Sequence, residues 1–183
     1  MSIVAGDSKS DEYHNPYFGF TVKYDGDWRD VSASQREALV KRTSAATMKK
    51  NAILLAIERG PQKGATNLTL TSAFVSKKDL IDDPQDYLRM VVTALAMQRS
   101  LGQESIRIEG STVFAGIKCF RATVALGRTT DGKERHWTYW VGQKGDYRLV
   151  ILGTYSSEED FEEIQRVLGG MPVEIDRPNV DGA

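Results

Sequence analysis

The chain has 183 residues, of which 40% are hydrophobic and 27% are charged, and this composition is typical of a globular protein with a substantial core. Its 24 basic and 25 acidic residues give a net charge of −1, which argues against a general nucleic-acid binder because such proteins carry a clear basic excess. The sequence has no uninterrupted apolar run of about 18 residues, so we expect no transmembrane segment.

The first residues of the chain are mostly small and polar. We expect a flexible N-terminal arm at residues 1–12, a single domain at residues 13–171 and a polar C-terminal tail at residues 172–183. The arm lacks the apolar stretch of a signal peptide. Two localisations therefore stay open: cytoplasmic, or extracytoplasmic and envelope-attached if an export signal was removed ahead of residue 1.

Every second residue from Phe18 to Tyr24 is apolar, which predicts a half-buried strand. Asp25-Gly26-Asp27 is expected to turn the chain, and Trp28 to anchor the core at the edge of a sheet. Ser34-Gln35-Arg36-Glu37 matches a capping box and predicts a helix from about Gln35 to Met48.

The middle of the chain predicts two strands, a long helix and a short strand. Ala52–Glu58 is almost continuously apolar, which is typical of a central strand covered on both faces, and Asn67–Val75 is its antiparallel return. Asp82-Asp83-Pro84 combines an N-cap residue with proline at the first helical position, and it opens the longest predicted helix, which runs to about Arg99. A short strand at Ser105–Glu109 and a bend at Gly110–Gly116 follow.

A three-stranded meander is predicted next, with a register that we derive from its two turns. Asp131-Gly132 suits a type I′ turn and sets Leu126 opposite Trp137. Gln143-Lys144-Gly145 suits a three-residue loop and sets Val141 opposite Tyr147. Together the two registers place one apolar set on a single face: Phe120, Ala122, Val124, Leu126, Trp137, Tyr139, Val141, Tyr147, Leu149 and Ile151. Ser156–Glu159 then matches a second capping box and predicts a helix as far as Leu168.

The opposite face of the meander is mixed in polarity, so we expect a helix or loop to cover part of it. The predicted register sets Trp140 opposite Arg148 in a cation–π contact and Arg121 near Asp146 in an ion pair. One interpretation is purely structural, with arginine stems packed on tryptophan. The other is a groove for an extended peptide, a helix or a small apolar ligand, because Trp and Arg are typical anchors. The candidate binding face is then Arg121, Thr123, His136, Thr138, Trp140 and Arg148.

No motif for catalysis or cofactor binding is present: the sequence has no Walker loop, no Gly-x-Ser-x-Gly elbow, no paired cysteines and no His-Glu-x-x-His. We expect no catalytic residue, no metal site and no cofactor. The single cysteine, Cys119, is expected to be a small buried residue. A nucleophilic pair of Cys119 with His136 is rejected, because the register separates them by about 15–20 Å and such a pair needs hydrogen-bond reach.

The order of these elements predicts an α+β fold with a mainly antiparallel sheet flanked by helices. Tyr13-His14-Asn15-Pro16-Tyr17-Phe18-Gly19-Phe20-Thr21-Val22-Lys23-Tyr24, followed by Gly26-Asp27-Trp28, resembles the "N-x-x-FGF-x-[IV]-x-YP-x-x-W" opening of PsbP/DcrB-like domains. The closing pattern is similar as well, with an aromatic hairpin, then Leu152–Ser156 and a helix that contains Phe161. Asp25 stands where the family usually has proline.

This resemblance covers roughly Tyr13 to Met171 and implies the Mog/PsbP-like α/β/α sandwich. Members of the family are mostly non-enzymatic: photosystem extrinsic subunits, bacterial envelope lipoproteins, secretion-effector chaperones and a eukaryotic factor that binds a small GTPase. It therefore implies a non-enzymatic binding or accessory domain that contacts a protein partner. The alternative is a small-molecule carrier, or an enzyme with a pocket built from scattered residues. The partner, the oligomeric state and the branch of the family stay open.

Overall fold

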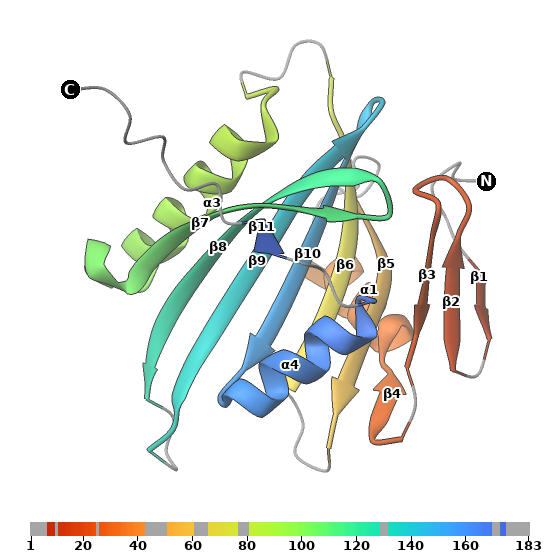
Figure 1. Ribbon diagram of the computed structural model, residues 1–183, viewed down its shortest axis with the longest axis horizontal. Coiled ribbons are helices and arrows are strands. Elements are labelled where there is room, and N and C mark those ends of the chain that lie inside the picture. The colour runs from red at the N-terminus through yellow and green to blue at the C-terminus, as the bar shows by residue number, and fades with distance from the viewer. Residues whose placement is uncertain are drawn as a thin grey trace.

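The main feature of the fold is an eight-stranded antiparallel sheet (Figure 1), seen in a computed structural model that describes residues 7–9, 11–24, 26–42, 51–60, 66–76, 81–128, 132–169 and 173–174. Its spatial order is β11-β7-β8-β9-β10-β6-β5-β4. The strands are, in chain order, β4 (Trp28–Asp30), β5 (Asn51–Arg59), β6 (Thr66–Phe74), β7 (Ile106–Phe114), β8 (Ile117–Arg128), β9 (Glu134–Lys144), β10 (Tyr147–Tyr155) and β11 (Val173–Glu174).

A second sheet of three strands lies beside β4 and β5 (Figure 1). It consists of β1 (Asp7–Lys9), β2 (Glu12–Asn15) and β3 (Phe20–Lys23). β1 and the first residue of β2 fall within residues 1–12, which the sequence predicts as a flexible arm, so regular structure begins earlier than predicted. β11 likewise falls within the predicted polar tail at residues 172–183, where it pairs with Ser111 and Thr112 of β7.

The segment between β2 and β3 explains why the opening motif has its particular residues. The side-chain oxygen of Asn15 accepts a hydrogen bond from the backbone N–H of Phe18 (3.0 Å), which closes a tight turn. Gly19 has φ +79°, a conformation that side chains rarely tolerate. Phe18 and Phe20 emerge from this turn fully buried. The motif therefore encodes a turn and two core contacts, and the predicted alternation of this strand is confirmed.

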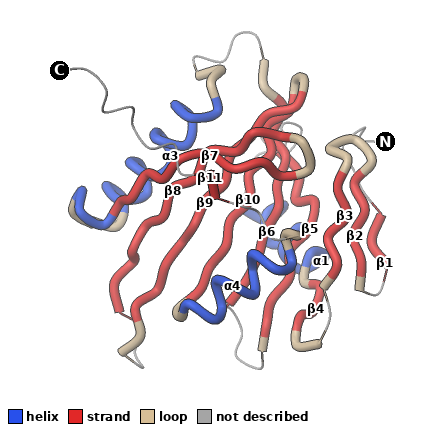
Figure 2. The backbone as a smooth tube through the Cα atoms, in the orientation of Figure 1, coloured by secondary structure: helices blue, strands red, loops and turns tan. Residues whose placement is uncertain are grey.

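Among the described residues, three α-helices flank the main sheet (Figure 2): α1 (Ser32–Arg42), α3 (Pro84–Gln98) and α4 (Glu158–Val167), with a short 3₁₀ turn, η1 (Gln103–Ser105), after α3. α1 lies along β5, where the guanidinium of Arg36 donates to the backbone carbonyls of Ile53 (3.0 Å) and Leu54 (2.9 Å). α3 and α4 pack on opposite faces of the sheet. The predicted α+β architecture with a mainly antiparallel sheet between helices is confirmed.

α3 and α4 both begin at a side-chain cap, at the predicted residue in α3 and one residue after the predicted Ser156 in α4. Asp83 caps α3 by accepting from the backbone N–H groups of Gln85 (2.7 Å) and Asp86 (3.1 Å), with Pro84 at the first helical position. Ser157 caps α4 by accepting from the N–H of Asp160 (3.2 Å). The prediction for α1 is wrong at its start, because the helix begins at Ser32, whose N–H is bound by Asp30. Its predicted end at Met48 lies outside the described residues.

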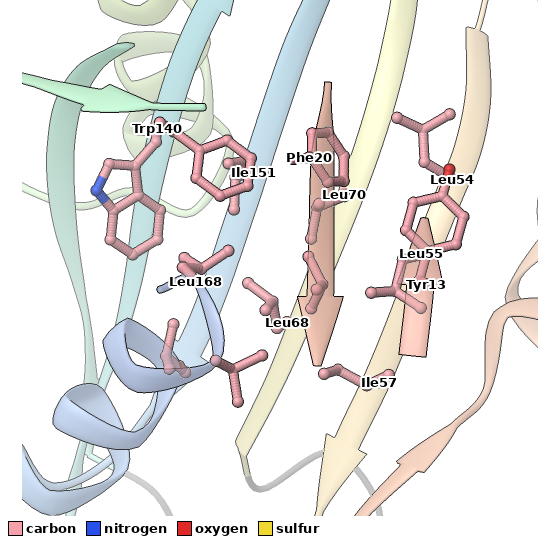
Figure 3. Close-up of a cluster of buried hydrophobic side chains, with 14 of the residues drawn as sticks. Tyr13, Phe20, Leu54, Leu55, Ile57, Leu68, Leu70, Trp140, Ile151 and Leu168 are labelled. Carbon is pink, nitrogen blue, oxygen red and sulfur yellow. The ribbon is translucent and has the colours of Figure 1, made fainter. Parts of the chain in front are cut away.

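The sheet separates two apolar cores. The α3-side core is a dry layer whose buried members are Leu88, Val92, Ala122, Val124, Tyr139 and Val141. The α4-side core is larger and also includes the small sheet (Figure 3). Residues from most strands and from α4 meet in it, among them Tyr13, Phe20, Leu55, Leu70, Trp140, Ile151 and Leu168. Trp28 belongs to this core, as its sequence position predicts.

The pairing of β8 with β9 differs from the predicted register by an even number of residues. Val124 lies opposite Trp137, and the predicted partner was Tyr139. The two-residue shift is absorbed by an irregularity between Ala125 and Arg128. Since side chains alternate with period two, an even shift leaves the faces unchanged, and the predicted faces of β8 and β9 are right. The predicted turn residue Asp131 lies outside the described residues.

The pairing of β9 with β10 differs from the predicted register by an odd number of residues. This difference turns every side chain of β10 to the face opposite the predicted one. Tyr147 lies opposite Lys144, three residues beyond the predicted Val141. The connection is a two-residue turn, Gly145-Asp146, with Gly145 at φ +56°. An odd shift moves every side chain of a strand to the other face. Leu149 and Ile151 therefore lie in the α4-side core, and the prediction that they share a face with Val124 and Tyr139 is wrong.

Candidate binding face

The structure brings together five of the six residues of the predicted binding face. Arg121, Thr123, His136, Thr138 and Trp140 point to the α4 side of β8 and β9, where Arg121 lies opposite Trp140 and Thr123 opposite Thr138. The sixth, Arg148, points to the α3 side, because the odd register difference places the side chains of β10 on the faces opposite to those predicted. The five residues that share a face are arranged around the start of α4.

Arg148 holds the beginning of α3 against the sheet. Its guanidinium donates to the backbone carbonyls of Ile81 (3.1 Å) and Asp82 (3.0 Å). It also lies over the ring of Tyr87, 4.1 Å from the ring centroid, a cation–π geometry. The predicted stacking of Arg148 on Trp140 is therefore wrong, and Arg148 is a buried support of a helix terminus.

A chain of hydrogen bonds connects four strands, β7 to β10, on the α4 side. We call its members, Glu109, Arg121, Thr123, Thr138 and Tyr155, the polar network. The Thr123 hydroxyl donates to the carboxylate of Glu109 (3.0 Å). Because a hydroxyl has one proton, Thr123 must accept from Thr138 (2.8 Å), and Thr138 must in turn accept from the Tyr155 hydroxyl (3.0 Å). Every hydroxyl in the polar network thus has a fixed direction.

Glu109 is the acceptor at the end of this chain. Its carboxylate pairs with the guanidinium of Arg121 and accepts from Nε of Arg107 (3.0 Å). The predicted ion pair of Arg121 with Asp146 is wrong, because the partner comes from β7 and not from the β9–β10 turn. Burial, the largest influence, lowers the pKa of Arg121, yet a guanidinium stays charged in proteins. The pair is a nearly buried charge pair that the threonine hydroxyl also supports.

Four aromatic rings border the polar network. Trp140 stacks parallel to Phe161 of α4 (6.2 Å between centroids, 6°), Phe161 contacts Tyr155 (4.8 Å), and Tyr155 stacks on His136 (5.3 Å, 21°). Gly153 allows this close packing, because a Cβ there would lie 3.2 Å from Ile164 and 3.3 Å from Trp140. The series runs from the core at Trp140, which is 1% exposed, to the surface at His136.

Arg107 is the most exposed side chain of this face, and His136 is partly exposed. Arg107 is 76% exposed and His136 is 27% exposed, whereas Thr123, Thr138 and Trp140 are buried. Sequence reasoning missed Arg107, Glu109, Tyr155 and Phe161. For the first two, the signal was the alternation Arg107-Ile108-Glu109, which places both charges on one face of a strand. The exposed part of the face is therefore Arg107 and His136, above a buried polar floor.

Burial keeps two ionisable side chains on the α4 side of the sheet in their neutral forms. It is the largest influence on Tyr155 and raises its pKa, and the hydrogen bond with Thr138 only partly opposes this effect. Burial also raises the pKa of the Cys119 thiol to about 12, and Cys119 is fully buried as predicted. Cys119 lies opposite Gly142 while His136 lies opposite Ala125, so the two are far apart along the strands. Among the described residues, no group of three or more His, Cys, Asp or Glu side chains is placed to hold a metal ion.

Comparison with known proteins gives similarity at the level of solved structures alone. No protein-family model and no curated protein matches the sequence. A structure from Bacteroides thetaiotaomicron is 10% identical over 92% of this chain, with a TM-score of 0.47, and this chain spans only 50% of that protein. The solution structure of cyanobacterial PsbP (CyanoP) from Synechocystis sp. PCC 6803 is 12% identical, with a TM-score of 0.48 and 94% of both chains covered.

In the described part of the chain, no helix has the length and hydropathy that a membrane crossing requires.

Proposed function

We propose that the protein is a non-enzymatic binding or accessory domain that contacts a protein partner through the exposed part of the α4-side face, at Arg107 and His136. One observation carries the proposal. The two exposed side chains are held in place by buried neighbours, Arg107 by Glu109 (3.0 Å) and His136 by the ring of Tyr155 (5.3 Å). Side chains that are fixed before binding lose little conformational entropy when a partner arrives.

The residue types at this face also suit protein contact. Arginine and aromatic residues are the commonest hot spots of protein interfaces, and here an exposed arginine and a histidine flank the rings of Tyr155 and Phe161. The polar network supplies a rigid floor, because each hydroxyl already has its partner. A partner could therefore bind without rearranging the core.

A non-enzymatic role fits the state of the ionisable groups. Catalysis by a nucleophile requires an activated group, such as a thiolate or a hydroxyl paired with a base. The thiol of Cys119 and the phenol of Tyr155 both have raised pKa values and are protonated at neutral pH. The Tyr155 hydroxyl donates its proton in a hydrogen bond to Thr138, so its role in the polar network is structural.

Site-specific photo-crosslinking tests the proposal. Benzoylphenylalanine at position 136 keeps an aromatic ring at this site, and the matched control carries it at Met90, an exposed position on α3. In an extract of the source organism, we expect position 136 to capture one discrete protein that position 90 does not capture. Equal capture at both positions, or none at position 136, would contradict the proposal. A small molecule retained through native mass spectrometry would favour the carrier alternative.

A further inference from the structure

Within the described part of the chain, one edge of β7 is left without a neighbouring strand over residues 106–110. On one side, β7 pairs with β8 from Ile106 to Phe114. On the other, β11 covers only Ser111 and Thr112, and no other strand in the described part of the chain lies against residues 106–110. Free strand edges are templates for pairing with another chain. The irregularity between Glu109 and Ser111 ends the regular stretch.

The side chains along this edge form a self-complementary pattern. Arg107 and Glu109 point to the α4 side, where they contact each other. Ile108 lies opposite Ala122 of the α3-side core, yet it is 47% exposed, which is unusual for an isoleucine in a sheet. The edge thus presents two opposite charges on one face and one apolar side chain on the other.

We propose that residues 106–110 of β7 pair antiparallel with the same residues of a second copy of this chain, around a two-fold axis at Ile108. Arg107 then lies opposite the partner's Glu109, and Glu109 lies opposite the partner's Arg107. The two copies of Ile108 meet on the α3 side. The pairing is isologous, as in most homodimers, and it joins the two eight-stranded sheets into one.

Charge selects this register over its neighbours. An axis at Arg107 would set arginine opposite arginine, and an axis at Glu109 would set glutamate opposite glutamate; like charges directly opposite destabilise a strand pair. An axis between two residues would bring the α4 side of one sheet against the α3 side of the other. Only the axis at Ile108 pairs opposite charges and keeps both faces continuous.

Distance favours the ion pairs between copies. Arg107 and Glu109 are two residues apart on one strand, which separates their Cβ atoms by roughly 7 Å. Residues directly opposite in an antiparallel pair have Cβ atoms about 5 Å apart. The carboxylate of Glu109 already receives Arg107 of its own chain, so it can receive the partner's Arg107 without moving from Arg121 and Thr123.

A single cysteine at the axis tests the pairing. In Ile108→Cys, the two thiols lie directly opposite, at a Cα separation of about 4.5–5.5 Å, which a disulfide can span. We expect a disulfide-linked dimer under mild oxidation. The matched control is Val113→Cys, on the same strand and 49% exposed, which the axis does not bring near its copy and which should form no disulfide-linked dimer under the same oxidation. The native Cys119 is buried and takes no part.

Sedimentation gives a second test that does not depend on cysteine. The mass of the native chain should rise with concentration toward twice that of one chain. Arg107→Glu should abolish this rise, because it sets glutamate opposite glutamate. The control Arg89→Glu makes the same charge change at an exposed position on α3 and should leave the rise intact. A native chain that stays monomeric, or cross-linking that is equal at positions 108 and 113, would overturn the proposal and leave the edge to a different partner.

Discussion

The two sides of the sheet are built on different principles. On the α3 side, apolar side chains of β8 and β9 meet Leu88 and Val92, and one buried arginine, Arg148, closes the border. On the α4 side, an apolar core and a polar network lie next to each other, and the charges of Glu109 and Arg121 are nearly buried. The first side needs only apolar volume, whereas the second needs particular partners at particular distances.

This difference has an energetic consequence. Apolar cores tolerate exchange among residues of similar volume, but a buried polar group that loses its partner incurs the full cost of its desolvation. We therefore expect the α3 side to accept conservative apolar changes and the polar network to reject isosteric ones. The following predictions test this contrast, in order of expected effect.

Trp140→Ala should have the largest effect, because it removes the side chain that links the α4-side core to α4. The tryptophan is fully buried and stacks on Phe161, so we expect a loss of about 3–5 kcal/mol in the free energy of unfolding. Urea denaturation measures this loss. Trp137→Ala is the control on the α3 side, where the ring is half-buried beneath Arg99. An equal loss for both variants would remove the contrast between the two sides.

Arg148→Ala should weaken the α3 side where a buried arginine supports the start of α3. The carbonyls of Ile81 and Asp82 lose their donor and the ring of Tyr87 loses its cation, for which we expect a loss of roughly 2–3 kcal/mol. Hydrogen exchange should accelerate first at the N-terminal turn of α3. Arg148→Lys keeps the charge but lacks the planar guanidinium, so its stability should lie between that of the native chain and that of Arg148→Ala. Exchange that accelerates equally along the whole chain would show that the support is not local.

Thr138→Val should cost about 1–2 kcal/mol although the shape of the side chain is unchanged. It deprives the Tyr155 hydroxyl of its acceptor and Thr123 of its donor. In a double-mutant cycle with Tyr155→Phe, the two losses should not add, because one hydrogen bond is common to both. Strictly additive losses would mean that the polar network is not a coupled unit.

The smallest effect concerns Glu163, which joins α4 to β4. Hydrogen bonds from Arg166, the largest influence, and from Trp28 lower the pKa of Glu163 to about 2 from its ordinary 4.5. Because the folded pKa lies below the unfolded value, the carboxylate stabilises the fold above pH 4.5, and this contribution is lost as the pH falls toward 2. Glu163→Gln should therefore be less stable than the native chain at pH 7 and nearly equal to it at pH 2. A difference that is constant with pH would disprove this role.

Local signals in the sequence predict most of the elements. The Asp83-Pro84 start and the apolar run of β5 depend on neighbours within a few residues, and the structure confirms them. The cap of α4 is Ser157, one residue after the predicted Ser156. Register depends on more than the turn residues. Gly145 can take positive φ in a two-residue turn as well as in a three-residue loop, and only the shorter turn directs Leu149 toward α4 and Arg148 toward α3.

The candidate site was predictable only in part for the same reason. Residues on β8 and β9 were assigned to the right face, because the predicted register between these strands was wrong by two residues, an even number that leaves the faces unchanged. Glu109 could not be paired with Arg121 from the sequence, because the segment 110–116 was predicted as a bend, while β7 continues to Phe114 and returns through a turn at Ala115-Gly116. A hydrogen-bond network that spans four strands depends on every register between them.

The link from Arg148 to the start of α3 also orders events during synthesis. Arg148 lies 66 residues beyond Asp82 in the chain, and a ribosome that adds 5–20 residues per second needs about 3–13 s to make that stretch. α3 carries its own cap at Asp83 and can form as soon as it leaves the ribosome. The apolar side of α3 then stays exposed to solvent until β8, β9 and β10 have been synthesised and can pack against it. This interval is the moment at which the nascent chain depends most on protection from aggregation.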